Sequence, residues 1–145
     1  MVIKASIHIN ANMDKVWETF TDLTCWNDWN TVIRDVYSSE KSLSSGGVLK
    51  CCFRPFLLPV NVKIEVEEVV PYESIVWSAK KRGLSARNTF FFEKYKGGVT
   101  VTSRETFKGS LVSFFGFLLP KKRMRTLIST FLQDLKTAAE NQLVP

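Results

Sequence analysis

The last part of the chain carries the apolar pattern of an amphipathic helix. From residue 124 onward, apolar side chains recur every three or four positions and share one helical face; they are Met124, Leu127, Ile128, Phe131, Leu132, Leu135, Ala138 and Ala139. A helix beginning at Pro120 would place the basic residues 121–123 in its first turn, against the helix dipole. We therefore predict that the helix begins at Leu111, with Ser110 as its N-cap and Pro120 as a bend.

Most of the preceding chain alternates between apolar and polar residues, which is typical of strands with one buried face. The alternation is clearest over residues 60–67, and it predicts further strands over residues 3–9, 32–38, 48–53, 74–79, 87–93 and 99–107. Asn10 or Asn12 would cap a helix over residues 13–23, with a short helix or turn over 24–30. A long helix with one apolar face needs a sheet to cover, so we predict an α+β domain with an antiparallel sheet.

Composition narrows the class of protein without naming a function. The 145 residues are 45% hydrophobic, which suits a single folded domain spanning residues 1–145. Cys25, Cys51 and Cys52 have no disulfide-framework spacing, so we expect a reducing, cytoplasmic setting. We expect no signal peptide and no membrane-spanning segment. The net charge is +6, but the basic residues are split between residues 80–82 and 121–125 without a recognition motif, so no nucleic-acid partner is expected.

Several short motifs resemble those of a known family. Val16-Trp17-Glu18, followed by Thr-Asp-Leu-Thr-Cys-Trp-Asn-Asp-Trp-Asn at residues 21–30, resembles a signature near the start of SRPBCC proteins. These are the polyketide cyclase/dehydrase and lipid-transport proteins, in the superfamily of START domains and birch-pollen allergens. Residues 46–47, 66–71, 76–77 and 102–109 fall at equivalent positions. Two residues depart from the family pattern: Thr31 stands where many members have proline, and Asn88 where many have a histidine facing the cavity.

The resemblance implies a helix-grip fold: a curved seven-stranded antiparallel sheet wrapped around a long C-terminal helix, with two short helices after the first strand. It also implies a cavity between sheet and helix. Members bind lipids, sterols, polyketides or hormones, and a minority catalyse cyclisation or dehydration. The leading hypothesis is therefore binding or transport of a small hydrophobic ligand without a cofactor; the alternatives are a cyclase or dehydratase and a membrane-associated lipid-transfer protein.

We expect the ligand to contact side chains on the concave side of the sheet, the second short helix and the long helix. These residues are Trp29, Asn30, Ile33, Leu49, Cys51, Phe53, Val62, Ile64, Trp77, Asn88, Phe90, Phe92, Ser103, Glu105, Leu127 and Phe131. Such residues also make a solid core. The polar side chains of Asn88, Ser103 and Glu105 on the same face favour a pocket, because polar groups there need partners.

Glu105 is the candidate for acid–base chemistry if the chain is an enzyme. Its alternative role is an ion pair across the sheet with Arg87 or Arg104. The single histidine, His8, lies on the polar face of its strand, so no histidine is expected to activate Cys51. The same shortage of ligands argues against a metal site.

Apolar and basic residues stand side by side before the long helix. Phe114, Phe115 and Phe117 precede Lys121, Lys122, Arg123 and Arg125. One interpretation is a lid over the cavity with a solvated basic face. The other is peripheral contact with an anionic membrane. The sequence leaves the oligomeric state open.

Overall fold

The computed structural model describes residues 1–54, 59–81, 83–109 and 121–141. They form a seven-stranded antiparallel sheet in the order β1-β7-β6-β5-β4-β3-β2, which confirms the predicted sheet. The strands are β1 (Val2–Ile9), β2 (Arg34–Tyr37), β3 (Val48–Phe53), β4 (Val60–Val70), β5 (Ser74–Lys81), β6 (Leu84–Tyr95) and β7 (Gly98–Lys108). Strands β2 to β7 pair with their neighbours in sequence, whereas β1 pairs with β7 from far along the chain.

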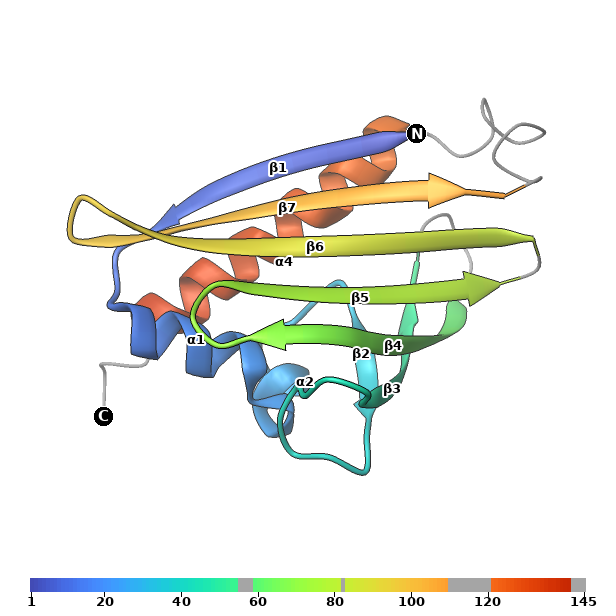
Figure 1. The fold of residues 1–145 in the computed structure, drawn as a ribbon, viewed down its shortest axis with the longest axis horizontal. Coiled ribbons are helices and arrows are strands. Elements are labelled where there is room, and N and C mark those ends of the chain that lie inside the picture. The colour runs from blue at the N-terminus through green and yellow to red at the C-terminus, as the bar shows by residue number, and fades with distance from the viewer. Residues whose placement is uncertain (55–58, 82, 110–120, 142–145) are drawn as a thin grey trace.

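The helices lie on one side of this sheet. They are α1 (Met13–Thr21), the 3-10 turn η1 (Leu23–Cys25), α2 (Trp26–Trp29) and the long helix α4 (Lys121–Asn141). Figure 1 shows α4 crossing one face of the sheet, which we call the inner face, with α1 and α2 at one end of the molecule. The Asn12 side chain accepts a hydrogen bond from the Lys15 N–H and caps α1, one of the two predicted caps. The predicted start at Leu111 and the bend at Pro120 lie outside the described residues.

The pairing register places inner-face side chains in rows across the sheet. One row runs from Glu105 through Asn88 and Trp77 to Val66. The neighbouring row contains Phe107, Ala86, Ala79, Ile64 and Leu49. These rows bring residues from β3 to β7 onto one surface beneath α4.

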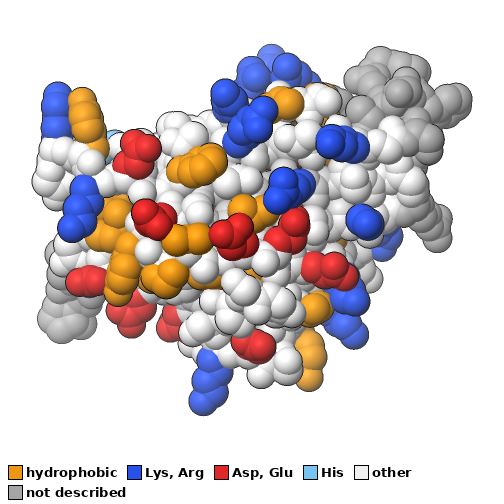
Figure 2. All heavy atoms as spheres, in the orientation of Figure 1, with side chains coloured by type: hydrophobic (Ala, Val, Ile, Leu, Met, Phe, Trp, Pro, Cys, Tyr) orange, Lys and Arg blue, Asp and Glu red, His pale blue; other side chains and the backbone are white. Residues whose placement is uncertain are grey.

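The opposite face of the sheet is polar. Figure 2 shows basic and acidic side chains spread over it, with scattered hydrophobic ones between them. A register shift between Val66 and Glu68 marks a bulge in β4, and both Glu67 and Glu68 are exposed. The Nε of Arg87 donates to a Glu67 carboxylate oxygen over 3.0 Å. The inner face is therefore the side on which the core forms.

Aromatic side chains join α1, α2, α4 and the sheet in one contact group, which we call the aromatic cluster: Phe20, Trp26, Trp77, Phe90 and Phe131. The Phe20 ring centroid lies 4.8 Å from that of Phe90 and 5.7 Å from that of Phe131. Edge-to-face contacts of this kind add to the hydrophobic stabilisation from burial. The cluster holds α4 against the sheet at the end where α1 and α2 lie.

Polar contacts fix the second half of α4 to the neighbouring elements. Asp134 accepts hydrogen bonds from the N–H and hydroxyl of Thr31, at 2.9 and 2.6 Å. Lys136 donates to the carbonyl of His8 over 2.8 Å, and Glu140 accepts from the N–H of Asn10 over 2.9 Å. The helix is thus tied both to the end of β1 and to the segment after α2.

Replacing Phe20 with alanine tests how much the aromatic cluster contributes to the stability of the fold. Phe20→Ala should lower the free energy of unfolding by about 3–5 kcal/mol, because it opens a cavity among fully buried rings. The matched control is Phe91→Ala, on the other face of the sheet, where the side chain is 43% exposed and the loss should stay below about 1 kcal/mol. Urea unfolding measures both, and equal losses would contradict the role given to Phe20.

Candidate functional site

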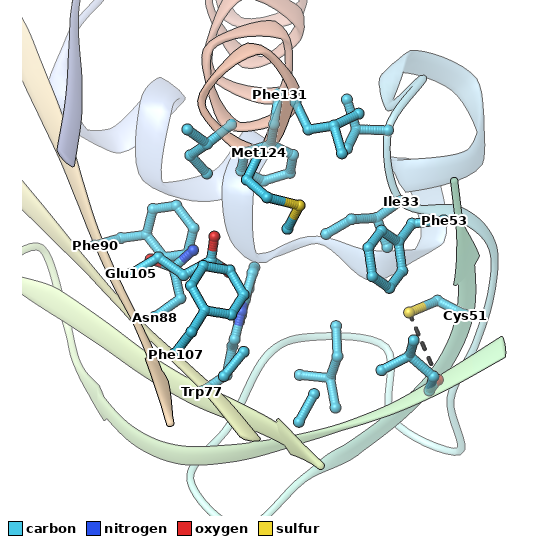
Figure 3. A pocket seen from close by; sticks show the side chains of 17 residues that line it. Ile33, Cys51, Phe53, Trp77, Asn88, Phe90, Glu105, Phe107, Met124 and Phe131 are labelled. Carbon is cyan, nitrogen blue, oxygen red and sulfur yellow. Dashed lines mark hydrogen bonds between the residues drawn. The ribbon is translucent and has the colours of Figure 1, made fainter. Parts of the chain in front are cut away.

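A cavity of about 120 Å³ lies between the inner face of the sheet and α4 (Figure 3). Its walls come from β3 to β7, the segment after α2, and the first half of α4. The lining residues are Val32, Ile33, Cys51, Phe53, Val62, Ile64, Trp77, Ala79, Ala86, Asn88, Phe90, Glu105, Phe107, Met124, Leu127, Ile128 and Phe131. Nearly all are apolar, so the cavity offers a ligand a hydrophobic surface with few polar contacts.

Two small side chains explain why space remains here. Ala79 and Ala86 face each other in the β5–β6 pair, with Ile64 and Phe107 on either side in the same row. A methyl group on each central strand does not reach α4, whose Met124 and Ile128 line the opposite wall. The row therefore has large side chains at its flanks and a gap in its middle.

One end of the cavity is closed by the aromatic cluster. The Trp77 and Phe90 centroids are 4.8 Å apart, and that of Phe131 lies 5.7 Å from that of Phe90. All three side chains also line the cavity. The same rings that hold α4 in place thus form an aromatic wall for a bound molecule.

A short hydrogen-bonded chain of polar groups stands in this apolar surface. The buried Ser103 hydroxyl donates to Oδ1 of Asn88 over 2.9 Å, and Asn88 hydrogen-bonds the Glu105 carboxylate. Since the Asn88 oxygen is occupied by Ser103, its NH₂ group is the donor to Glu105. Figure 3 shows the Glu105 side chain extending into the cavity.

Burial raises the pKa of Glu105 from 4.5 to about 7, although the hydrogen bond from Asn88 lowers it. The alternative role of Glu105, an ion pair with Arg87, is not found: Arg87 donates to Glu67 on the opposite face. Arg104 precedes Glu105 on β7, so its side chain leaves the sheet on the other side. Glu105 thus lacks a basic neighbour among the residues described around it.

The thiol of Cys51 is a poor nucleophile near neutral pH. Burial, with the nearby Cys52 as a smaller cause, raises its pKa to about 12. The thiol donates to the carbonyl oxygen of Val62, at 3.7 Å. Because the thiolate is the nucleophilic form, Cys51 serves as a small apolar lining residue near neutral pH.

Comparisons with known proteins place this chain in a family. Residues 1–140 match the family model described as polyketide cyclase/dehydrase and lipid transport. The chain belongs to this family. No curated protein sequence matches it significantly.

Solved structures of low sequence identity share the family fold. TTHA0849 from Thermus thermophilus has a TM-score of 0.81 at 15% identity, over 96% of this chain and 97% of that one. Ara h 8.0201 has 0.73 at 11% identity, over 100% and 99%. The di-domain ARO/CYC protein BexL, from the BE-7585A biosynthetic pathway, has 0.69 at 17% identity, over 97% of this chain and 50% of BexL. At these identities the likeness establishes the fold alone.

The two residues that depart from the family pattern, Thr31 and Asn88, both make hydrogen bonds in the structure. Thr31, where many members have proline, supplies both hydrogen bonds to Asp134 of α4. Proline has no N–H and no hydroxyl, so it would make neither bond. Asn88, where many members have histidine, links Ser103 to Glu105. The described lining of the cavity contains no histidine.

Most of the predicted ligand-contact residues line the cavity: Ile33, Cys51, Phe53, Val62, Ile64, Trp77, Asn88, Phe90, Glu105, Leu127 and Phe131. Five others do not. Leu49 is packed in the core, and Ser103 lies behind Asn88. Phe92 packs on Phe20 and Trp17 under α1. Trp29 packs on Trp26 and Phe131, while the Asn30 oxygen accepts the N–H groups of Val32 and Ile33.

The prediction missed six lining residues: Val32, Ala79, Ala86, Phe107, Met124 and Ile128. Continuing the strand alternation by two residues would have found three of them, since Ala79 follows Trp77, Ala86 precedes Asn88, and Phe107 follows Glu105. The helical spacing likewise contained Met124 and Ile128. Small residues were overlooked because their importance lies in the space they leave.

The other predicted groups that the structure describes are not among the lining residues of the cavity. Lys121, Lys122, Arg123 and Arg125 are exposed at the start of described α4, while Phe114, Phe115 and Phe117 fall outside the described residues. His8 contacts Thr100 and the Tyr95 ring. In the described part of the chain, no group of side chains could hold a metal ion, and no helix has the length and apolarity to cross a membrane.

The raised pKa of Glu105 predicts a pH-dependent stability. Protonated Glu105 favours the folded state below its unfolded pKa of 4.5, and this contribution is lost as pH rises through about 7. From about pH 5 to about pH 8, the free energy of unfolding should therefore fall by up to about 3 kcal/mol. Glu105→Gln should remove that decline in urea unfolding, whereas Glu65→Gln, an exposed control, should keep it. A decline of equal size in both variants would contradict this assignment.

Proposed function

We propose that this chain binds a small hydrophobic molecule in the cavity between the sheet and α4, as a carrier or binding protein. The observation that supports the proposal most is the composition of the cavity wall. Aliphatic and aromatic side chains make up nearly all of it, with Asn88 and Glu105 together at one place. An apolar pocket with a few grouped polar atoms can both desolvate a ligand and orient it.

The size of the cavity indicates which probes suit a first test. Burial of apolar ligand surface contributes roughly 25 cal/mol per Å². A dry cavity of roughly 150 Å³ lined by aliphatic and aromatic residues can hold benzene. The cavity here is about 120 Å³, so compounds with one ring are suitable. A sterol or a long lipid is larger than this volume.

Glu105 supports an enzymatic alternative, a cyclase or dehydratase on an aromatic or polyketide-like substrate. A carboxyl group with a pKa near neutrality can accept and return a proton. Among the described lining residues, Cys51 is the other titratable one, and its thiol stays protonated. A single proton-transfer group fits ligand binding with fewer assumptions than it fits catalysis.

Filling the gap between the two alanines tests the binding proposal. Benzyl alcohol should bind the unaltered chain, and Ala86→Leu should weaken binding at least about tenfold because the new side chain occupies the cavity. Ser85→Leu, on the other face of the same strand, is the matched control and should leave affinity unchanged. Isothermal titration calorimetry measures all three. Failure of benzyl alcohol and a wider apolar panel to bind, with nothing retained in native mass spectrometry, would overturn the proposal.

Contact with anionic membranes is a second candidate, supported by the exposed basic residues at the start of described α4. Replacing Lys121 and Lys122 with glutamine should weaken binding to phosphatidylserine vesicles by about tenfold or more, since each basic residue contributes on the order of 1 kcal/mol. Lys94→Gln with Lys96→Gln removes equal charge at the β6–β7 turn and should have little effect. Co-sedimentation measures the affinities, and equal loss in both double variants would argue against this candidate.

A further inference from the structure

Among the residues that the structure describes, Glu105 has no basic partner, and the wall around it is nearly all apolar. Its partner across β6 is Asn88, and its partner across β1 is Ile3. The α4 side chains that line the cavity are Met124, Leu127, Ile128 and Phe131, none of which carries charge. A carboxylate in such surroundings gains strongly from a cation that enters the cavity, because apolar side chains solvate a charge poorly.

Neighbouring groups prepare this carboxylate to accept a hydrogen bond. The Ser103 hydroxyl donates a hydrogen bond to Oδ1 of Asn88. This leaves the NH₂ group of Asn88 as the donor to Glu105. One donor does not saturate a carboxylate, whose two oxygens can accept about four hydrogen bonds. A ligand that donates N–H bonds fits the remaining positions, whereas a ligand carboxylate would bring a second negative charge.

Aromatic rings in the same cavity favour the same kind of ligand. Trp77, Phe90, Phe107 and Phe131 contribute to its lining. The faces of such rings carry partial negative charge and attract ammonium groups, more strongly when water is excluded. These rings also provide apolar surface for the uncharged part of the molecule.

We propose that the cavity selects an apolar ligand that carries a protonated amine, which Glu105 and the surrounding aromatic rings hold. The inference rests on the proposed binding function and names its ligand class. The amine donates hydrogen bonds to the ionised Glu105 carboxylate. A neutral ligand with a carbonyl group would instead need protonated Glu105 as a donor, so the two classes have opposite pH dependence.

The direction of that dependence follows from the groups that face the ligand. Glu105 titrates near neutrality, while the Cys51 thiol stays protonated. Asn88 and the lining side chains of α4 do not titrate. Affinity for an amine should therefore rise as pH increases through about 7, since ionised Glu105 is then available without the loss of a proton.

Three compounds of one shape and different charge test the inference: benzylamine, benzyl alcohol and benzoate. Calorimetry with the full chain at about pH 8 should show benzylamine binding at least about tenfold more tightly than benzyl alcohol, and benzoate more weakly than either. Benzylamine affinity should fall at least about fivefold on going to about pH 6. Tighter binding of the alcohol, or amine affinity that does not change with pH, would overturn the inference and leave the proposed binding function standing.

Variants assign the preference to Glu105. Glu105→Gln should abolish the advantage of benzylamine over benzyl alcohol. A single cooperative urea-unfolding transition shows that the variant is folded. Glu67→Gln, on the opposite face of the sheet, should behave like the unaltered chain. Retention of the amine preference in Glu105→Gln would overturn the inference. Failure of all three compounds to bind the unaltered chain would overturn the inference and count against the proposed function as well.

Discussion

The packing of Phe131 against the rings of Phe20 and Phe90 is the contact on which the rest of the structure depends. It fixes α4 against the sheet at one end, where α1 and α2 complete the core. Farther toward the start of described α4, Met124 and Ile128 face two alanines, and the space between them stays open. One helix therefore closes a core with one part of its length and covers a cavity with another.

The arrangement divides stability and binding between neighbouring parts of the same sheet. The aromatic cluster contributes burial and ring contacts, whereas the cavity leaves apolar surface without packing partners. Glu105 adds an electrostatic cost to folding at neutral pH, because its ionised form is poorly solvated there. Such a cost at a potential binding site is understandable if a ligand offsets it, since only the bound state then satisfies the carboxylate.

Local patterns were sufficient for much of the fold and part of the site. Alternation along residues 60–66 identified the inner face of β4, and the bounds of β3 were predicted as observed. The β5–β6 hairpin extends beyond its predicted ends, where Lys80 and Lys81 obscure the alternation. Local patterns could not decide between the two roles considered for Glu105, because an ion pair across a sheet depends on register and on which face each arginine occupies.

The sequence by itself determined the fold class, the face of each main strand and the family resemblance, because these follow from periodicity and from motifs in order along the chain. Only the tertiary structure decided that Ala79 and Ala86 meet beneath α4 and that Ser103, Asn88 and Glu105 form one hydrogen-bonded chain. Both arrangements join residues far apart in sequence. Their existence depends on strand register and on the distance from sheet to helix, which no local pattern contains.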